Sequence, residues 1–184
     1  MTRYQFPDGF FWGAAASGPQ TEGVEGKPHR SIWDSWFAEH PERFYQQTGP
    51  QKVCETYSKY KDDVALMKGL NFNSFRTSIQ WSRLIADFET GEPDADAVDF
   101  YNAYLDEMIA NGIEPMINLY HFDMPEALQK KYGGFESAKV TDLFARFAHT
   151  AFSLFGHKVK HWITFNEPIV PVEGGYLYDF HYPC

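Results

Sequence analysis

The chain has 184 residues, of which 43% are hydrophobic and 18% aromatic, so it can bury one sizeable core and is not expected to be disordered. Its net charge of −9 argues against a nucleic-acid partner, because a basic stripe is expected where a protein meets phosphates. A small anionic ligand is not excluded, since a few local cations can outweigh a distant field.

The same sequence carries no sign of secretion or of a membrane span. Cys54 and Cys184 are the only cysteines, and they make neither a disulfide framework nor a paired metal-ligand spacing, which favours a reducing compartment. Residues 1–7 lack the apolar stretch of a signal peptide. The apolar run over 10–16 is too short to cross a bilayer. We therefore expect a cytoplasmic protein with no membrane partner.

Short apolar runs alternate with segments whose apolar side chains recur at three- and four-residue intervals, the spacing of a helix face. In chain order the predicted elements are strand 10–15, helix 52–68, strand 73–79, helix 95–110, strand 115–120, helix 138–155 and strand 159–165. Gly69 is a plausible stop for the first helix. Asp94 is a suitable N-cap for the second, and Gly112 follows its end.

Strands that alternate with helices pair in parallel through right-handed crossovers. A doubly wound sheet fits this order, but the polar groups at the strand ends favour a barrel, where strand C-termini converge on the active site. These groups are Gln20 and Glu22, Arg76, His121, and Asn166 with Glu167. Because a (β/α)8 barrel needs about 250 residues, we expect an α/β fold that is the N-terminal half of a TIM barrel. Residues 1–184 would form a single incomplete domain of about four parallel strands and three crossover helices, truncated after strand four.

The segment Thr164–Pro168 places an amide beside a carboxylate at the end of the fourth predicted strand. This pair suits glycoside hydrolysis, because Glu167 can protonate a leaving-group oxygen while Asn166 holds the sugar 2-hydroxyl. The alternative is a capped turn in which Asn166 bonds its own backbone and Pro168 ends the strand.

Arg76 alternates with Phe75 and Thr77 along the second strand, so in a barrel it would face the interior. A buried guanidinium requires carboxylate partners, and its natural role there is to orient a nucleophilic carboxylate and keep it ionised. An exposed arginine on an edge strand is the alternative.

Two further polar residues are candidates for sugar binding. His121 directly follows the third strand, where a neutral imidazole can bond a hydroxyl, although a lone histidine is more often structural. Gln20 could hold vicinal hydroxyls, or could belong to ordinary turn chemistry. We interpret the tryptophans Trp33, Trp36, Trp81 and Trp162 as core or rim packing rather than as sugar platforms.

Together these segments resemble glycoside hydrolase family 1 along essentially the whole chain. The matching segments are 6–15, 20–23, 31–34, 75–83, the His121 segment and 164–168. The resemblance implies that Gln20, His121 and Asn166 contact the substrate sugar, that Glu167 is the general acid/base, and that Arg76 supports the nucleophile. It implies no metal and no organic cofactor.

The segment His121–Pro125 resembles the branch of the family that acts on phosphorylated glycosides, since plain β-glucosidases usually carry tryptophan and leucine where this chain has Phe122 and Met124. Segments 16–20 and 168–176 are likewise similar to bacterial 6-phospho-β-glucosidases. The implied substrate is a phosphorylated β-glycoside such as a disaccharide. Plain β-glucosides and 6-phospho-β-galactosides remain alternatives.

The family's nucleophilic glutamate and its phosphate-binding groups fall beyond Cys184, so we expect no hydrolysis by the isolated 184 residues. The alternative to an enzyme is a non-catalytic half-barrel. Its exposed first and last strands would invite pairing with another chain and therefore self-association.

Overall fold

In the computed structural model, which describes residues 4–183, the centre of the fold is one parallel sheet of four strands in the order β1-β2-β5-β6. The strands are β1 (Gly13–Ala15), β2 (Ser74–Ser78), β5 (Glu114–Tyr120) and β6 (His161–Phe165). Each coincides with a predicted strand, so the four-stranded parallel α/β arrangement is confirmed. β1 packs so closely on β2 that a side chain at Gly13 would collide with the Ser74 carbonyl oxygen.

Three long helices make the crossovers between these strands, as predicted: α3 (Thr56–Gly69), α5 (Ala95–Ala110) and α7 (Ala138–Phe155). Asp94 caps α5, its carboxylate accepting from the Ala97 amide at 2.9 Å. The predicted start of the first helix is wrong by four residues, because Val53 and Glu55 have φ of 47° and 56°, outside the helical region. Its predicted stop is also displaced, since Gly69 is still helical and the left-handed turn falls at Asn71, with φ of 59°.

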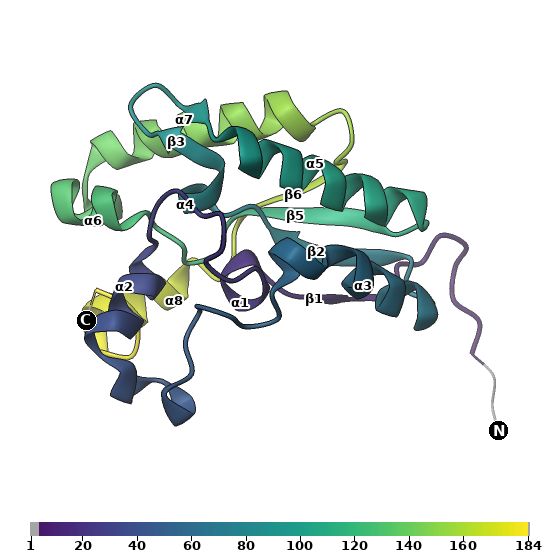
Figure 1. Cartoon of the computed structure of the whole chain (residues 1–184), viewed down its shortest axis with the longest axis horizontal. Coiled ribbons are helices and arrows are strands. Elements are labelled where there is room, and N and C mark those ends of the chain that lie inside the picture. The colour runs from purple at the N-terminus through teal and green to yellow at the C-terminus, as the bar shows by residue number, and fades with distance from the viewer. Residues whose placement is uncertain (1–3, 184) are drawn as a thin grey trace.

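The connections hold short elements that the hydrophobic periodicity did not predict. They are α1 (Gly18–Thr21), α2 (Ile32–Glu39), η1 (Pro41–Arg43), η2 (Tyr45–Gln47), α4 (Trp81–Leu84), the antiparallel pair β3 (Ile85–Asp87) and β4 (Glu92–Pro93), α6 (Glu126–Tyr132), η3 (Gly134–Glu136), α8 (Ile169–Val172) and the π-helical η4 (Glu173–Leu177). Figure 1 shows α1, α2, α6 and α8 gathered beyond the ends of the strands, away from the N-terminus. This is the end of the sheet where polar side chains were expected to meet.

The core lies between the sheet and the helices α5 and α7, which run alongside β5 and β6 (Figure 1). Trp81 is 1% exposed and stacks on Phe147 with ring centroids 5.5 Å apart, so this tryptophan packs the core as predicted. The edge strands are different, because all of β1 and much of β6 are exposed. No helix in residues 4–183 has the length and apolar character needed to cross a membrane.

Candidate active site

A cavity of about 380 Å³ opens where β1, β2, β5 and β6 end. All five predicted site residues line it, together with two alanines: Ala15, Ala16, Gln20, Arg76, His121, Asn166 and Glu167. These residues come from distant parts of the chain; Arg76 and His121, for example, are 45 residues apart. They meet because the carboxyl ends of parallel strands lie at one end of the sheet. The structure therefore assembles the predicted residues into one site, while their individual roles stay predictions.

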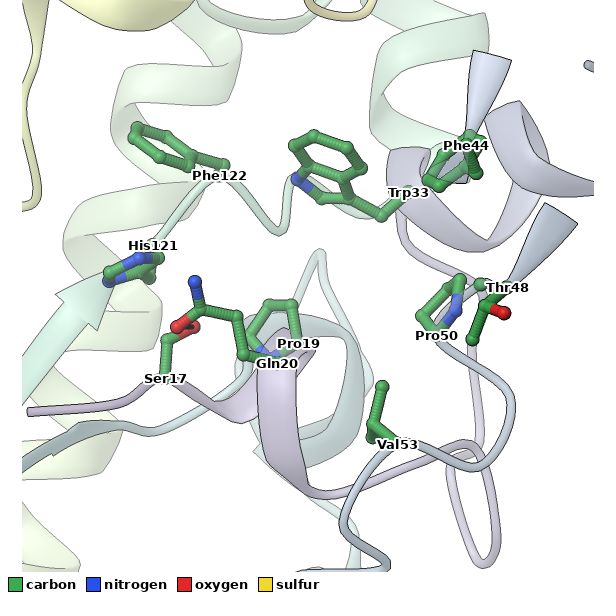
Figure 2. Close-up of a pocket in the computed structure, with 11 residues that line it drawn as sticks. Ser17, Pro19, Gln20, Trp33, Phe44, Thr48, Pro50, Val53, His121 and Phe122 are labelled. Carbon is green, nitrogen blue, oxygen red and sulfur yellow. Dashed lines mark hydrogen bonds between the residues drawn. The ribbon is translucent and has the colours of Figure 1, made fainter. Parts of the chain in front are cut away.

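Gln20 belongs to α1, a single helical turn that follows β1 and begins after Ser17. The Ser17 hydroxyl donates to Gln20 Oε1 at 2.9 Å, which leaves the amide N–H groups to donate elsewhere. In Figure 2 the amide nitrogen points into the space between His121 and Trp33. Gln20 thus presents two donors to the cavity, which is what binding of a hydroxylated ligand requires.

His121 follows β5 directly and is buried, with its ring beside Arg76. Arg76 Nη1 lies 3.3 Å from His121 Nδ1, and because a guanidinium can only donate, Nδ1 is the acceptor and the ring proton is on Nε2. Burial, and then the positive charge of Arg76, lower the pKa of His121 to about 4. The imidazole is therefore neutral near pH 7 and offers an Nε2–H donor.

Arg76 is half-buried on β2, which lies between β1 and β5, so the alternative of an exposed edge-strand arginine is wrong. Its Nη1 donates to the Ala16 carbonyl oxygen at 3.1 Å as well as to His121. Within residues 4–183 no carboxylate pairs with it, so the expected carboxylate partner is not found there. The remaining N–H groups of a permanently charged side chain line the cavity, where they can hold an anionic group.

Asn166 and Glu167 continue from β6 at the far side of the cavity. The Asn166 amide donates to the Tyr120 carbonyl oxygen at 2.9 Å, and its side-chain Nδ2 donates to Glu167 Oε2 at 3.3 Å. The alternative in which the Asn166 side chain caps its own backbone is therefore not what the structure shows. Glu167 is exposed and has φ of 38°, a strained value for a residue before proline, and such strain tends to cluster at functional sites.

Asp123 does not line the cavity but bonds the backbone at His121, and the sequence patterns did not identify it. It is fully buried, and its two carboxylate oxygens accept from the His121 amide at 3.1 Å and the Trp81 amide at 2.7 Å. Burial raises the pKa of this carboxyl to about 6. The contact with the Trp81 amide spans 42 residues, so no local signal in the sequence identifies Asp123.

A second cavity, of about 370 Å³, adjoins the first and shares Gln20 and His121 with it. Figure 2 shows its aromatic wall, where Trp33, Phe44 and Phe122 surround the opening above α1. The rings of Trp33 and Phe44 meet edge to face with centroids 6.0 Å apart. Trp33 therefore borders a cavity, whereas Trp36 is 5% exposed and packed inside.

The fold and the site define a class of protein: a parallel α/β fold of the barrel type, in which acid, amide and imidazole groups meet at the carboxyl ends of the strands. Comparison with known proteins then gives the family. The sequence pattern of glycosyl hydrolase family 1 matches residues 2–184, and the chain belongs to that family of glycosidases.

Sequence relatives include bacterial and plant enzymes. The chain is 54% identical over 183 residues to the 6-phospho-β-glucosidase GmuD of Bacillus subtilis (strain 168), covering 98% of this chain and 39% of GmuD. It is 40% identical over 186 residues to a furostanol glycoside 26-O-β-glucosidase of Hellenia speciosa, covering all of this chain and 33% of that enzyme. The chain therefore spans less than two fifths of the length of either relative.

Solved structures agree with the fold. A rice β-glucosidase superposes with a TM-score of 0.88 at 35% identity, covering 97% of this chain and 37% of the rice chain. The psychrophilic β-glucosidase BglU of Micrococcus antarcticus gives a TM-score of 0.83 at 33% identity, covering 91% of this chain and 35% of BglU. The four strands thus correspond to the N-terminal part of the family's TIM barrel, as predicted.

Proposed function

We infer that these residues form the acid/base half of a retaining glycosidase that hydrolyses 6-phospho-β-glucosides. The observation that carries this proposal is the cavity itself. Among its described lining residues Glu167 is the one carboxylate, and it lies with Asn166, His121 and Gln20 around a space that also contains the Arg76 guanidinium. A retaining mechanism needs a second carboxylate about 5–5.5 Å from the first. In this proposal that carboxylate is supplied by the part of the barrel outside this chain, and Arg76 orients it.

Each polar residue of the cavity has a role in such a reaction. Gln20 and His121 donate hydrogen bonds to sugar hydroxyls, and Asn166 holds the 2-hydroxyl. Glu167 protonates the glycosidic oxygen as its bond to the anomeric carbon breaks, while the second carboxylate bonds to that carbon. Glu167, now ionised, takes a proton from water as the water attacks the same carbon and the bond from that carbon to the second carboxylate breaks. The sugar phosphate leaves, and both carboxyl groups return to their starting states.

The preference for a phosphorylated sugar rests on sequence similarity. The 54% identity is to a protein named as a 6-phospho-β-glucosidase, and the chain has Phe122 and Met124 where plain β-glucosidases usually have tryptophan and leucine. Plant β-glucosidases match at lower identity, 40% for the Hellenia speciosa enzyme, so plain β-glucosides remain the second candidate and 6-phospho-β-galactosides the third.

The proposal is tested by hydrolysis of p-nitrophenyl β-glucoside and its 6-phosphate. Residues 1–184 alone are compared with a chimera that joins them to the part of GmuD beyond the matched segment. We expect no hydrolysis by residues 1–184, because the cavity has one carboxylate among its described lining residues, and hydrolysis mainly of the phosphate by the chimera.

Turnover by residues 1–184 that is lost in Glu167→Gln would contradict the need for a second, external carboxylate. A chimera in which Phe122→Trp with Met124→Leu leaves the preference for the phosphate unchanged would contradict the part of that preference assigned to this chain. Self-association is the non-catalytic candidate, favoured by the exposed strands β1 and β6. An inactive chimera, together with a molar mass of residues 1–184 that rises with concentration, would favour it.

The aromatic cavity beside Gln20 is placed to receive the leaving group. In the chimera, Trp33→Ala is expected to raise KM about tenfold for an aryl glycoside and to leave kcat nearly unchanged, because ring contacts stabilise ground and transition states alike. A methyl glycoside cannot reach this wall and should be unaffected. Tyr45→Ala is the control, since Tyr45 is 85% exposed. Equal effects on methyl and aryl substrates would contradict this role for Trp33.

A further inference from the structure

Glu22 lies two residues after Gln20 and is buried in a cluster of polar side chains that the reaction does not use. Glu22 is 2% exposed, and Arg83 and Gln80 are 0% and 1% exposed. Glu22 Oε2 accepts from Arg83 Nε and from Gln80 Nε2, each at 2.7 Å. The Tyr101 hydroxyl lies 3.1 Å from both carboxylate oxygens. A carboxylate this deeply buried is stable only because three side chains bond it.

Arg83 bonds the backbone around Glu22 as well as its carboxylate. Its Nη2 donates to the Gly23 carbonyl oxygen at 2.9 Å, and its Nη1 donates to the Glu25 carbonyl oxygen at 2.8 Å. The guanidinium carbon lies 4.4 Å from the centre of the Tyr57 ring. All three guanidinium nitrogens are therefore used, and they attach the loop after α1 to the helix α4.

The Tyr101 hydroxyl remains a donor in this cluster. Burial, followed by the negative charge of Glu22, raises the pKa of Tyr101 well above its ordinary value. The hydroxyl oxygen in turn accepts from the Gln80 backbone amide at 2.9 Å. The cluster thus connects three segments, the loop after α1, the start of α4 and the middle of α5.

α1 depends on this cluster for its position. It has four residues, and a single turn is not stable by itself because helix nucleation is unfavourable. Its first residue, Gly18, is in direct contact with the cluster, since a Cβ there would lie 2.5 Å from Gln80 Cγ and 2.8 Å from Glu22 Oε1. The Glu22 amide closes the turn by donating to the Gly18 carbonyl oxygen at 2.9 Å.

We propose that Glu22, held by Arg83, is a positioning residue that fixes α1 and so aims the Gln20 amide into the cavity. The inference rests on the sugar-binding role proposed above for Gln20. Removing an ion pair that only stabilises the fold would lower the stability of the whole chain equally. Removing a positioning pair changes the conformation of the Gly18–Glu22 turn and of the Gln20 amide even where the stability of the chain is preserved.

The test uses the 184-residue chain and the double substitution Glu22→Gln with Arg83→Met. Removing both charges together avoids leaving one of them buried and unpaired, so the fold is expected to be retained. We expect amide hydrogen exchange over residues 17–23 to become at least about tenfold faster, with exchange in α5 and α7 unchanged. The NMR signals of the Gln20 side-chain amide, identified by their loss in Gln20→Met, are expected to shift or broaden.

Gln80→Met is the second variant, because it removes one of the hydrogen bonds to Glu22 and leaves the ion pair intact. It should move the same Gln20 signals by a smaller amount. Glu55→Gln is the matched control, since it breaks an exposed ion pair with Lys59. A folded double variant with unchanged exchange over 17–23 and unchanged Gln20 signals would overturn the proposal, and so would equal effects in Glu55→Gln. These measurements need no substrate, so an inactive chimera would count against the proposed function and not against the positioning role.

Discussion

Replacing Glu167 by glutamine in the chimera is expected to lower hydrolysis of a 6-phosphorylated β-disaccharide by about 10²- to 10⁴-fold, the usual contribution of a general acid. The sugar that leaves such a substrate is a poor leaving group unless its oxygen is protonated as the bond breaks. Asn166 Nδ2 donates to Glu167 Oε2 at 3.3 Å in the native chain. Glutamine keeps the shape of the glutamate side chain and can keep this contact, but it has no acidic proton to give. The loss should therefore appear in kcat rather than in KM.

An activated aryl glycoside provides the internal comparison, because its leaving group needs little protonation. For the aryl substrate the loss in the bond-breaking step should stay below about tenfold. The values of kcat/KM for the two substrates, which report the bond-breaking step, measure the difference. Glu173→Gln is the matched control, since Glu173 lies in the segment that follows Glu167 and does not line the cavity. Disaccharide hydrolysis that is unchanged in Glu167→Gln would remove Glu167 from the mechanism.

The second large effect concerns the dependence of stability on pH, which His121 and Asp123 drive in opposite directions. The folded state lowers the pKa of His121 from 6.5 to about 4, so between these values the unfolded chain binds a proton that the folded chain does not. This contribution to stability is complete above pH 6.5 and is lost as the pH falls to 4. The folded state raises the pKa of Asp123 from 3.8 to about 6, so the folded chain keeps a proton that the unfolded chain has lost. That contribution is complete below pH 3.8 and is lost as the pH rises to 6.

Each shift corresponds to about 3 kcal/mol of unfolding free energy at most, and the two largely cancel in the native chain. The His121 shift comes from burial and Arg76 and the Asp123 shift chiefly from burial, so removing one group leaves the other shift in place. In Asp123→Asn, stability should increase steeply between pH 4 and 6.5, where only His121 of the pair still titrates. In His121→Gln, stability should decrease between pH 4 and 6 as Asp123 ionises.

Urea unfolding at several pH values in this window measures both slopes. The control is His157→Gln, because His157 is exposed and is not one of the hydrogen-bond partners of Asp123. Parallel pH profiles for the native chain and the two variants would show that neither group titrates as its surroundings in the fold require.

The strands, the crossover helices and the five cavity residues follow from local features of the chain. The helices α5 and α7 have the predicted bounds because their apolar side chains recur with helical spacing, and Asp94 caps α5 through a residue only three positions away. The polar residues Arg76, His121 and Glu167 could be placed together because parallel strands carry their carboxyl ends to one edge. Short-range periodicity and a rule of strand direction were sufficient for this part.

The supports of the site depended on contacts that no local pattern contains. Glu22 meets Arg83 across 61 residues and Tyr101 across 79. The sequence placed its carboxylate among the polar groups at the strand ends, whereas in the structure it is buried and does not line the cavity. The backbone bonds that bury Asp123, the neutral state of His121 and the left-handed backbone at Glu55 likewise arise only when the segments pack. The sequence by itself determined which elements form and which polar groups meet at the strand ends, because those depend on periodicity and chain direction. The tertiary structure alone decided how these groups are charged and aimed, because burial and partners distant in the chain set both.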